Sequence, residues 1–262
     1  MIELFTDRGG PIGETPLVIL HGFTGSGRAM SSVVEPLRRT RDVITVDLLG
    51  HGQSPSPESV DSYAMAAVVE QVVAVVGAEP VDLFGYSMGG RVALSIAIAH
   101  RQRIRRLAVL GGSPGIIDAA ERAERHRRDQ ALADSIAGDG LAAFVDRWMA
   151  LPMFASLSTL GGDWLESSRK QRLSSDAVGL ANSLRGTGTG AMPPLHQDLA
   201  NLELPVLVMA GSSDEKYLAI GRSMVAGLTN GLMREIADAG HAAHLESPAI
   251  CVKELAEFLD GR

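Results

Sequence analysis

The stretch VDLFGYSMGGRVALSIAIA, residues 81–99, decides the fold that we expect for the whole chain. Its mostly apolar start, VDLF, is typical of a buried β-strand, and GRVALSIAIA has the apolar spacing of a helix. Ser87 lies between them in the pattern Gly-x-Ser-x-Gly. Glycines on either side allow the tight strand-to-helix turn that exposes such a serine in a strained backbone conformation. The stretch therefore predicts a reactive serine at the edge of a sheet.

Four other apolar runs resemble the strand before Ser87: PLVILHG (16–22), DVITVDLLG (42–50), RRLAVLGG (105–112) and LPVLVMAG (204–211). Val, Leu and Ile follow one another in them without strict alternation, as is typical of strands covered on both faces. Helical stretches such as SSVVEPLRRT and SYAMAAVVEQVVAVVGA lie between the runs, with apolar residues at three- and four-residue spacing. This order predicts an α/β fold, in which helices flank a mostly parallel, twisted sheet.

The length of 262 residues allows a single domain with one large core. Strand-like runs stop after Gly115 and resume only after about Leu195, and the segment between is rich in Ala, Arg, Glu and Ser at helical spacing. We name residues 116–195 the cap and expect a helical lid over the carboxyl ends of the strands. Residues 1–115 and 196–262 then form the core, and residues 1–262 form one domain.

Charge and composition exclude several classes of partner. The formal net charge of −7 gives no electrostatic reason to expect nucleic acid. The single cysteine, Cys251, excludes an internal disulfide. The N-terminal residues do not have the pattern of a targeting signal, and no run of about 18 apolar residues occurs. We therefore expect a cytoplasmic protein without a membrane partner.

Since no metal-ligand spacing, phosphate loop or dinucleotide fingerprint occurs, we also expect no metal and no cofactor. The sequence does not indicate an oligomeric state.

Ser87 requires an imidazole to accept its proton and a carboxylate to orient that imidazole. In a fold of this class the order along the chain is serine, acid, histidine. Asp214 follows the last predicted strand, and His241 follows a glycine near the C-terminal end. We therefore expect Ser87, Asp214 and His241 to form a catalytic triad. Neighbouring residues could take the role of the acid or of the base: Glu215, Asp238 and His244.

Backbone N–H groups hold the oxyanion in chemistry of this kind. One comes from the residue after the serine and the other from the loop after an earlier strand, which here are Met88 and Phe23. His21 and His51 lie in two glycine-containing loops, HGF and GHGQS. Two histidines could contribute to a metal site, but no further ligands accompany them, so we expect them to brace these loops.

Arg91 follows Ser87 by four residues and therefore shares a helix face with it. A buried cation is unfavourable unless an anion meets it. The sequence allows two such anions, an internal carboxylate or an anionic substrate. Arg122 and Arg125 at the start of the cap have glutamates beside them, so they are also compatible with a solvent-exposed helix that carries ion pairs.

The motifs LHGF, DLLGHGQS, GYSMGG, GSSD and AGH occur in this order, and through them the chain resembles the α/β-hydrolase superfamily over essentially its full length. That resemblance implies the fold but not the reaction, because the superfamily contains hydrolases, lyases, peroxidases and receptors. The turn around Ser87, which we call the elbow, and the cap also resemble the 2-succinyl-6-hydroxy-2,4-cyclohexadiene-1-carboxylate synthases of menaquinone biosynthesis. The stretches that carry this second resemblance are GYSMGGR, GGSPGI, ERAERHRRD, FVDRWMALPMFASL and SLRGTGTGAMPPL. The cap is where α/β-hydrolases differ most, so this second resemblance is the more specific one.

The second resemblance implies a lyase that eliminates pyruvate from 2-succinyl-5-enolpyruvyl-6-hydroxy-3-cyclohexene-1-carboxylate, a substrate with three carboxylates. The product is 2-succinyl-6-hydroxy-2,4-cyclohexadiene-1-carboxylate. Because no water is consumed, the triad acts as a proton-abstracting base instead of an acylated nucleophile. By position, the resemblance implies substrate-binding roles for five residues: Tyr86, Arg91, Arg125, Trp148 and Arg172.

Several alternatives remain open at this level. Arg169 could take the place of Arg172 because the match is loose around SSRKQRLSS. Trp148 is also compatible with a packing role between the cap and the core. A serine hydrolase, either an esterase or a carbon–carbon bond hydrolase, would use the same triad. A non-catalytic receptor would keep the pocket without the reaction.

Overall fold

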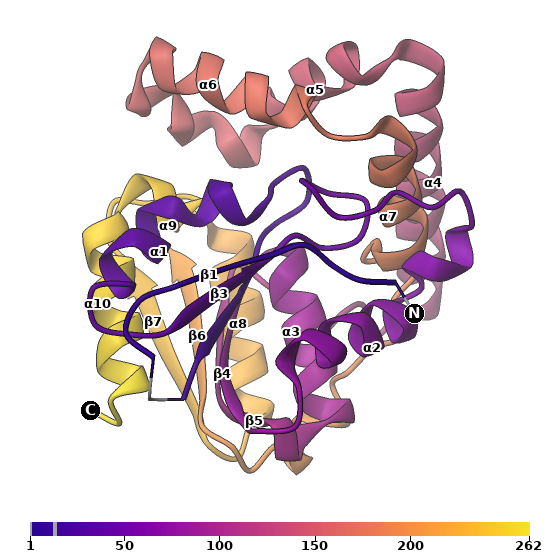
Figure 1. Ribbon diagram of the computed structural model, residues 1–262. Coiled ribbons are helices and arrows are strands. Elements are labelled where there is room, and N and C mark those ends of the chain that lie inside the picture. Colours follow the sequence, from indigo (N-terminus) through magenta and orange to yellow (C-terminus); the bar gives the residue numbers. More distant parts are fainter. Residues whose placement is uncertain (1, 13–14) are drawn as a thin grey trace.

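A seven-stranded sheet forms the centre of the protein, and helices lie on both of its faces (Figure 1). The computed structural model describes residues 2–12 and 15–262. The strands are β1 (Thr6–Gly9), β2 (Leu17–Leu20), β3 (Val43–Val46), β4 (Val81–Tyr86), β5 (Ile104–Leu110), β6 (Val206–Gly211) and β7 (Gly231–Ile236). Their order across the sheet is β1-β3-β2-β4-β5-β6-β7. Only the β1–β3 pair is antiparallel within the described sheet. The predicted α/β fold is confirmed.

The five predicted strands are β2 to β6, and the sequence did not reveal the two edge strands. β2, β4 and β6 are buried at every position, so their sequences are apolar except for Asp82 in β4, which pairs with Arg105. β1, TDRG, is mostly exposed, and β7, GLMREI, has only one buried residue. Edge strands bury fewer side chains than central strands do. Their sequences therefore lack the continuous apolar pattern of the central strands.

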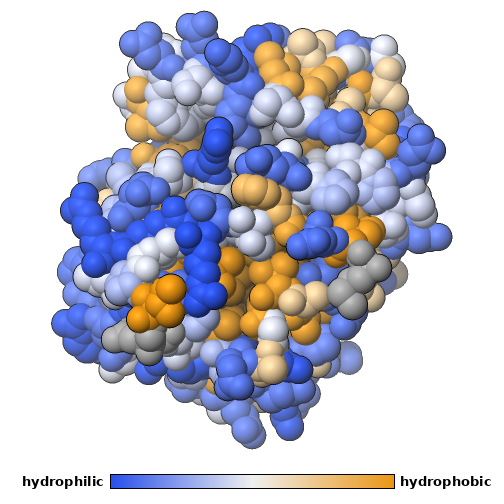
Figure 2. Space-filling view, in the orientation of Figure 1, coloured by the Kyte–Doolittle hydropathy of each residue, from blue (hydrophilic) through white to orange (hydrophobic). Residues whose placement is uncertain are grey.

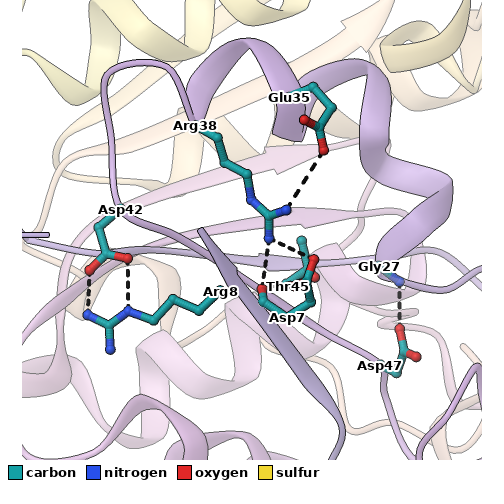
Figure 3. A network of polar contacts seen from close by, with 8 residues as sticks. All are labelled: Asp7, Arg8, Gly27, Glu35, Arg38, Asp42, Thr45 and Asp47. Carbon is teal, nitrogen blue, oxygen red and sulfur yellow. Dashed lines mark hydrogen bonds and ion pairs between the residues drawn. The ribbon is translucent and has the colours of Figure 1, made fainter. Parts of the chain in front are cut away.

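Ion pairs attach the polar edge of the sheet to its neighbours (Figure 3). In β1, the Arg8 guanidinium grips the buried Asp42 carboxylate, with Nε 2.9 Å from Oδ1. Arg38 extends from the end of α1 to the Asp7 carboxylate at 2.9 Å. These charged contacts hold β1 against the sheet, because β1 has few buried apolar side chains to do so.

The helices outside the cap cover both faces of the sheet. They are α1 (Ser31–Leu37), α2 (Met65–Val76), α3 (Met88–Ala99), α8 (Glu215–Gly227), α9 (Ala243–Glu246) and α10 (Pro248–Leu259). Residues of α2, α3 and α8 pack into one apolar core, and residues of α1 and α10 pack into the other. Cys251 is a buried free thiol in α10. Short 3-10 helices lie in the connections: η1 (Gly27–Met30), η2 (Val60–Tyr63), η3 (Arg101–Arg103) and η5 (Leu199–Asn201).

Helices make up the regular structure of the cap, which lies above one end of the sheet (Figure 1). They are α4 (Ala119–Asp139), α5 (Leu141–Met149), η4 (Pro152–Leu160), α6 (Gly162–Leu173) and α7 (Ala177–Thr187). Phe144, Leu180 and Ile136 belong to a small apolar core of the cap, and Phe23 from the loop after β2 packs against it. The cap therefore contacts the main core through the loop that follows β2.

The face in Figure 2 is largely hydrophilic, with apolar residues gathered at its centre and near its top. Among the described helices, none is both long enough and apolar enough to cross a bilayer.

Candidate active site

Ser87 occupies a strained turn between β4 and α3. Its φ of 53° and ψ of −107° lie outside the regions that residues with a side chain normally adopt. Glycines make the turn possible: a Cβ on Gly85 would lie 2.3 Å from the carbonyl oxygen of Gly89, and one on Gly89 would lie 2.4 Å from that of Leu20. The Ser87 N–H donates to the carbonyl of Leu110 at 2.8 Å. The predicted strand–turn–helix geometry is thus present.

The structure brings Ser87, His241 and Asp214 together at the carboxyl ends of three strands. His241 Nε2 lies 3.0 Å from Ser87 Oγ, and His241 Nδ1 lies 2.7 Å from Asp214 Oδ2. The other oxygen of Asp214 accepts the backbone N–H of Tyr217 at 3.3 Å. The His241 ring is almost completely buried. This is the geometry that lets an imidazole accept a serine proton while a carboxylate fixes the tautomer of the ring.

The alternative acids and the alternative base lie elsewhere. Glu215 and Asp238 are exposed, whereas Asp214 hydrogen-bonds His241. The His244 ring is buried, with its centroid 4.2 Å from that of Tyr86. Burial, reinforced by nearby His241 and Arg172, lowers the pKa of His244 to about 3. His244 is therefore a neutral packing residue beside the site.

Phe23 and Met88, the predicted oxyanion-hole residues, both line the cavity above Ser87. Met88 is the first residue of α3, where a backbone N–H has no partner within its own helix. Gly22 lies against Tyr86, because a Cβ at Gly22 would lie 2.7 Å from the Tyr86 ring. The loop after β2 can approach the serine this closely only with glycine at that position.

His21 supports the same loop through two backbone contacts. Its Nε2 accepts the N–H of Leu48 at 3.0 Å, and its Nδ1 lies 2.8 Å from the carbonyl of Gly22. Burial lowers the pKa of His21, and it lowers the pKa of His51 to about 3. Neutral rings in these positions can connect backbone groups of the two loops, which is the bracing arrangement that we expected.

The cavity above Ser87 lies between the core and the cap. Four of the five predicted substrate-binding residues line it: Tyr86, Arg91, Arg125 and Trp148. The fifth, Arg172, does not line it. Its guanidinium extends from α6 to Thr24 Oγ1, and its Nε is buried without a hydrogen-bond partner in the described structure. Burial lowers the pKa of Arg172, while nearby Tyr86 opposes that shift.

The side chain of Arg169 lies on the outside of the cap. Its guanidinium grips Asp146 through two contacts of 2.6 and 3.0 Å, and both side chains are exposed. Of the two candidates, Arg172 is therefore the arginine that extends toward the loop after β2.

Arg91 makes no ion pair with a carboxylate in the described residues. Its Nη2 donates to the carbonyl of Thr187 at 3.0 Å, and Nη1 donates to Thr189 Oγ1. Its Nε is buried and has no partner in residues 2–12 or 15–262. Burial lowers the pKa of Arg91, and Tyr217 and Asp129 counteract only part of that shift. The internal carboxylate that the sequence left open is not in contact with it.

Arg125 does have such a partner. Its Nε lies 2.8 Å from Asp129 Oδ1, and the Asp129 side chain is only 3% exposed. The second oxygen of Asp129 accepts the N–H of Gly190 at 3.2 Å. By contrast, Arg128 pairs with Glu124 on the exposed side of α4. The interpretation of Arg122 and Arg125 as exposed, glutamate-paired residues is therefore wrong. Arg122 donates to the carbonyl of Ile116 at 2.8 Å, and Arg125 pairs with Asp129 and faces the cavity.

Trp148 has both a packing role and an unpaired polar group. Its ring centroid lies 5.1 Å from that of Phe23, 6.0 Å from that of Phe144 and 5.8 Å from that of Phe154. Its indole Nε1–H is buried without a hydrogen-bond partner in the described residues. A buried donor beside a cavity is suited to an acceptor atom of a ligand.

Lys216 and Tyr217, in the first turn of α8, are among the cavity residues that sequence reasoning missed. The Tyr217 ring lies 4.5 Å from the ring of His241, and the Lys216 ammonium lies 5.5 Å from the Tyr217 ring. Burial raises the pKa of Tyr217. Their position directly after Asp214 was the available signal, since the turn that presents the acid also presents the next residues to the cavity.

Comparisons with known proteins show the family of this chain. The family model of the alpha/beta hydrolase fold matches residues 15–248. A Bacillus subtilis (strain 168) protein, provisionally named 2-succinyl-6-hydroxy-2,4-cyclohexadiene-1-carboxylate synthase, is 38% identical over 95% of this chain and 92% of its own length. The protein of that name from Serratia proteamaculans (strain 568) is 31% identical over 93% and 92% of the two chains.

Solved structures also show similarity to this family. The MenH structure from S. aureus superimposes with a TM-score of 0.92 at 34% identity, covering 98% of each chain. The enol-lactonase from Burkholderia xenovorans LB400 has a TM-score of 0.83 at 21% identity, covering 98% of this chain and 96% of its own, a likeness that concerns the fold alone. The chain belongs to the α/β-hydrolase fold family and, within it, to the family of 2-succinyl-6-hydroxy-2,4-cyclohexadiene-1-carboxylate synthases.

Proposed function

We propose that this protein is a carbon–oxygen lyase of menaquinone biosynthesis. It eliminates pyruvate from 2-succinyl-5-enolpyruvyl-6-hydroxy-3-cyclohexene-1-carboxylate to give 2-succinyl-6-hydroxy-2,4-cyclohexadiene-1-carboxylate. The observation that carries the proposal is Arg91, a cation one helical turn from Ser87 that forms no ion pair with a carboxylate in the described residues. A cation in that place favours an anionic substrate over a neutral ester. The names of the relatives support the same reaction.

The first step is removal of a proton by the triad. The ring carbon that bears the succinyl ketone carries an acidified hydrogen, because the adjacent carbonyl stabilises the carbanion as an enolate. His241 Nε2, 3.0 Å from Ser87 Oγ, takes the serine proton, and Ser87 Oγ removes the proton from carbon. Asp214 stabilises the imidazolium that forms.

The second step is expulsion of the leaving group. The enolate oxygen lies in the hole formed by the N–H groups of Phe23 and Met88. When the enolate collapses, the ketone re-forms, a double bond forms between ring carbons 2 and 3, the existing 3,4 double bond moves to carbons 4 and 5, and the carbon–oxygen bond to the enolpyruvyl group at carbon 5 breaks. The group leaves as the enolate of pyruvate, takes the proton that His241 holds and tautomerises to pyruvate, so the neutral triad is restored and atoms and charge balance without water. Ser87 stays unmodified throughout.

Polar groups around the cavity bind the three carboxylates of the substrate. Arg91, on α3, and Arg125, on the cap helix α4, both line the cavity. The Trp148 indole N–H and the Tyr86 side chain supplement them, and Arg172 acts from beside the loop after β2. Holding the substrate in one orientation and neutralising its charge supplies most of the rate enhancement.

A small-molecule tricarboxylate is therefore the partner that we propose, with no nucleic acid, membrane or cofactor involved. A cytoplasmic location belongs to the same proposal, because a trianion does not cross a bilayer unaided.

A serine hydrolase is the second candidate, since the triad distances also suit nucleophilic attack. One assay separates the candidates. The purified protein is incubated with the enolpyruvyl substrate while pyruvate is followed by a coupled dehydrogenase and the diene by its absorbance. We expect both products in equal amounts. The proposal is wrong if neither appears and a p-nitrophenyl ester instead gives a burst of nitrophenol that labels Ser87. Absence of any turnover, together with a ligand-dependent rise in Tm, would point to a receptor.

A further inference from the structure

One carboxylate holds the backbone on both sides of His241. Glu246, the last residue of α9, accepts the N–H of Gly240 through Oε2 at 2.7 Å and the N–H of Ala242 through Oε1 at 3.2 Å. Gly240 and Ala242 are the two residues that flank His241 in the chain. Both oxygens of a single side chain are therefore engaged with the loop that presents the catalytic imidazole.

The loop between β7 and α9 has other hydrogen bonds near His241, but they use its carbonyls: Ala239 accepts the N–H of Ser213 at 2.9 Å, and Ala242 accepts the N–H of Leu245 at 2.7 Å. The loop is bounded sterically, because a Cβ on Gly211 would lie 2.1 Å from the carbonyl oxygen of Gly240, and one on Gly240 would lie 2.6 Å from Ser156 Oγ. Packing of this kind excludes wrong positions but does not fix the tilt of a peptide group. Hydrogen bonds from two N–H groups to one carboxylate fix that tilt. Because the carboxylate is charged, such bonds are stronger than hydrogen bonds between neutral groups.

The His241 ring has to satisfy two partners at once. Nδ1 lies 2.7 Å from Asp214 and Nε2 lies 3.0 Å from Ser87, on opposite sides of the ring. A rotation of the backbone at residue 241 lengthens one contact as it shortens the other. Displacements of about 1 Å at a catalytic group can lower the rate about 100-fold.

We propose that Glu246 is a positioning residue of the triad, which aligns His241 between Asp214 and Ser87 by fixing the peptide groups on both sides of it. Glu246 does not line the cavity above Ser87, so it acts through His241 and not on the substrate. The inference rests on the base role of the triad in the proposed function, but it does not depend on the identity of the substrate.

Glu246→Gln is the sharpest variant, because the amide has nearly the shape of the carboxylate. Both N–H groups of the loop are donors, so the amide must place its own NH2 against one of them. One hydrogen bond is lost and two donors face each other. Glu257→Gln is the matched control, since Glu257 lies on α10, its side chain is 42% exposed, and its carboxylate pairs with Lys253 at 3.9 Å.

The first readout is the split between kcat and KM for pyruvate release. We expect Glu246→Gln to lower kcat about 10- to 100-fold while KM changes less than about twofold, because the substrate-binding arginines are untouched. Glu257→Gln should match the wild type in both. A kcat of Glu246→Gln within about twofold of the wild type overturns the proposal, and so does a loss that only follows the fraction of unfolded protein in circular dichroism.

The second readout does not use the substrate. A fluorophosphonate labels Ser87 at a rate that depends on His241 as base, and we expect Glu246→Gln to lower that rate about 10-fold or more. An unchanged labelling rate overturns the inference. If the wild type is labelled but releases no pyruvate, the proposed function fails, whereas slow labelling of Glu246→Gln still supports the positioning role. Should Glu246→Gln not fold, the same labelling is measured on Glu246→Asp, whose shorter side chain cannot reach both N–H groups. An intermediate rate supports the proposal, and a wild-type rate overturns it.

Discussion

Two sets of polar groups meet at the cavity, which we call its chemical side and its binding side, and they differ in how they are satisfied. On the chemical side, Ser87, His241 and Asp214 are hydrogen-bonded to one another. On the binding side, the buried Nε of Arg91 and the indole N–H of Trp148 have no partner in the described residues. Buried donors are nearly always paired in folded proteins, so unpaired ones in a cavity indicate where a ligand supplies the acceptor. The difference separates the groups that perform the chemistry from the groups that bind the substrate.

The largest effect should come from the side that performs the chemistry. Ser87→Ala removes the base, and we expect kcat to fall at least about 1,000-fold. The dissociation constant of the substrate should stay within about threefold of the wild type, because the binding side is intact. Stopped-flow turnover and calorimetric titration measure the two quantities. A variant that keeps a tenth of the activity would remove Ser87 from the mechanism.

On the binding side, Arg91→Ala should lower kcat/KM by about 30- to 1,000-fold, which corresponds to about 2–4 kcal/mol for a forked contact with a carboxylate. The fold should remain intact, as thermal unfolding would show. Arg128→Ala is the control, because Arg128 pairs with Glu124 on the exposed face of α4 and should have no effect. Near wild-type kcat/KM in Arg91→Ala would contradict the division between the two sides.

The buried histidines of the chemical side make stability depend on pH. Burial lowers the pKa of His244 to about 3, so the folded protein keeps the ring neutral. The unfolded chain takes up a proton below about pH 6.5, hence this stabilising contribution is complete above 6.5 and is lost as the pH falls toward 3. At pH 5 the loss is about 2 kcal/mol.

His244→Phe should remove this part of the pH dependence. Urea unfolding between pH 7 and 4 would then give a flatter curve for the free energy of unfolding than in the wild type. Some slope should remain, because burial also lowers the pKa of His51 to about 3. Parallel curves for the two proteins would show that His244 is not held neutral in the fold.

The smallest effect concerns a single donor. Trp148→Phe keeps an aromatic ring against Phe23 and removes the unpaired N–H. One lost hydrogen bond of about 1 kcal/mol should raise KM about fivefold with little change in kcat. Trp164→Phe, in the α6 helix of the cap, is the control and should leave KM unchanged, because Trp164 does not line the cavity. An unchanged KM in Trp148→Phe would mean that Trp148 only packs.

Features that depend on neighbouring residues in the chain could be predicted from the sequence, whereas features that depend on contacts between distant residues could not. The central strands and the elbow at Ser87 were predictable because burial on both faces and a tight turn leave local patterns of apolar residues and glycine. β1 was not predictable, since its attachment through Arg8 and Asp42 joins residues far apart in the chain. The grip of Glu246 on the loop around His241 also leaves no periodic signal, because it depends on how a short helix folds back on that loop.

The cap shows the same limit at the level of single side chains. The sequence indicated arginines, but only the folded arrangement separates Arg125, which faces the cavity, from Arg128, which pairs outside it. Likewise, Arg169 grips Asp146 on the surface while Arg172 extends to Thr24. Helical spacing fixes which residues share a face, and the packing of the cap decides which face meets the substrate.

The mass of the protein during turnover tests the central claim, that Ser87 acts as a base and not as an acylated nucleophile. The enzyme is mixed with the enolpyruvyl substrate, quenched in acid while pyruvate is still accumulating, and weighed by intact-protein mass spectrometry. The account predicts the unmodified mass of the chain at every time point. A covalent adduct that maps to Ser87 and disappears as the substrate is exhausted would contradict it.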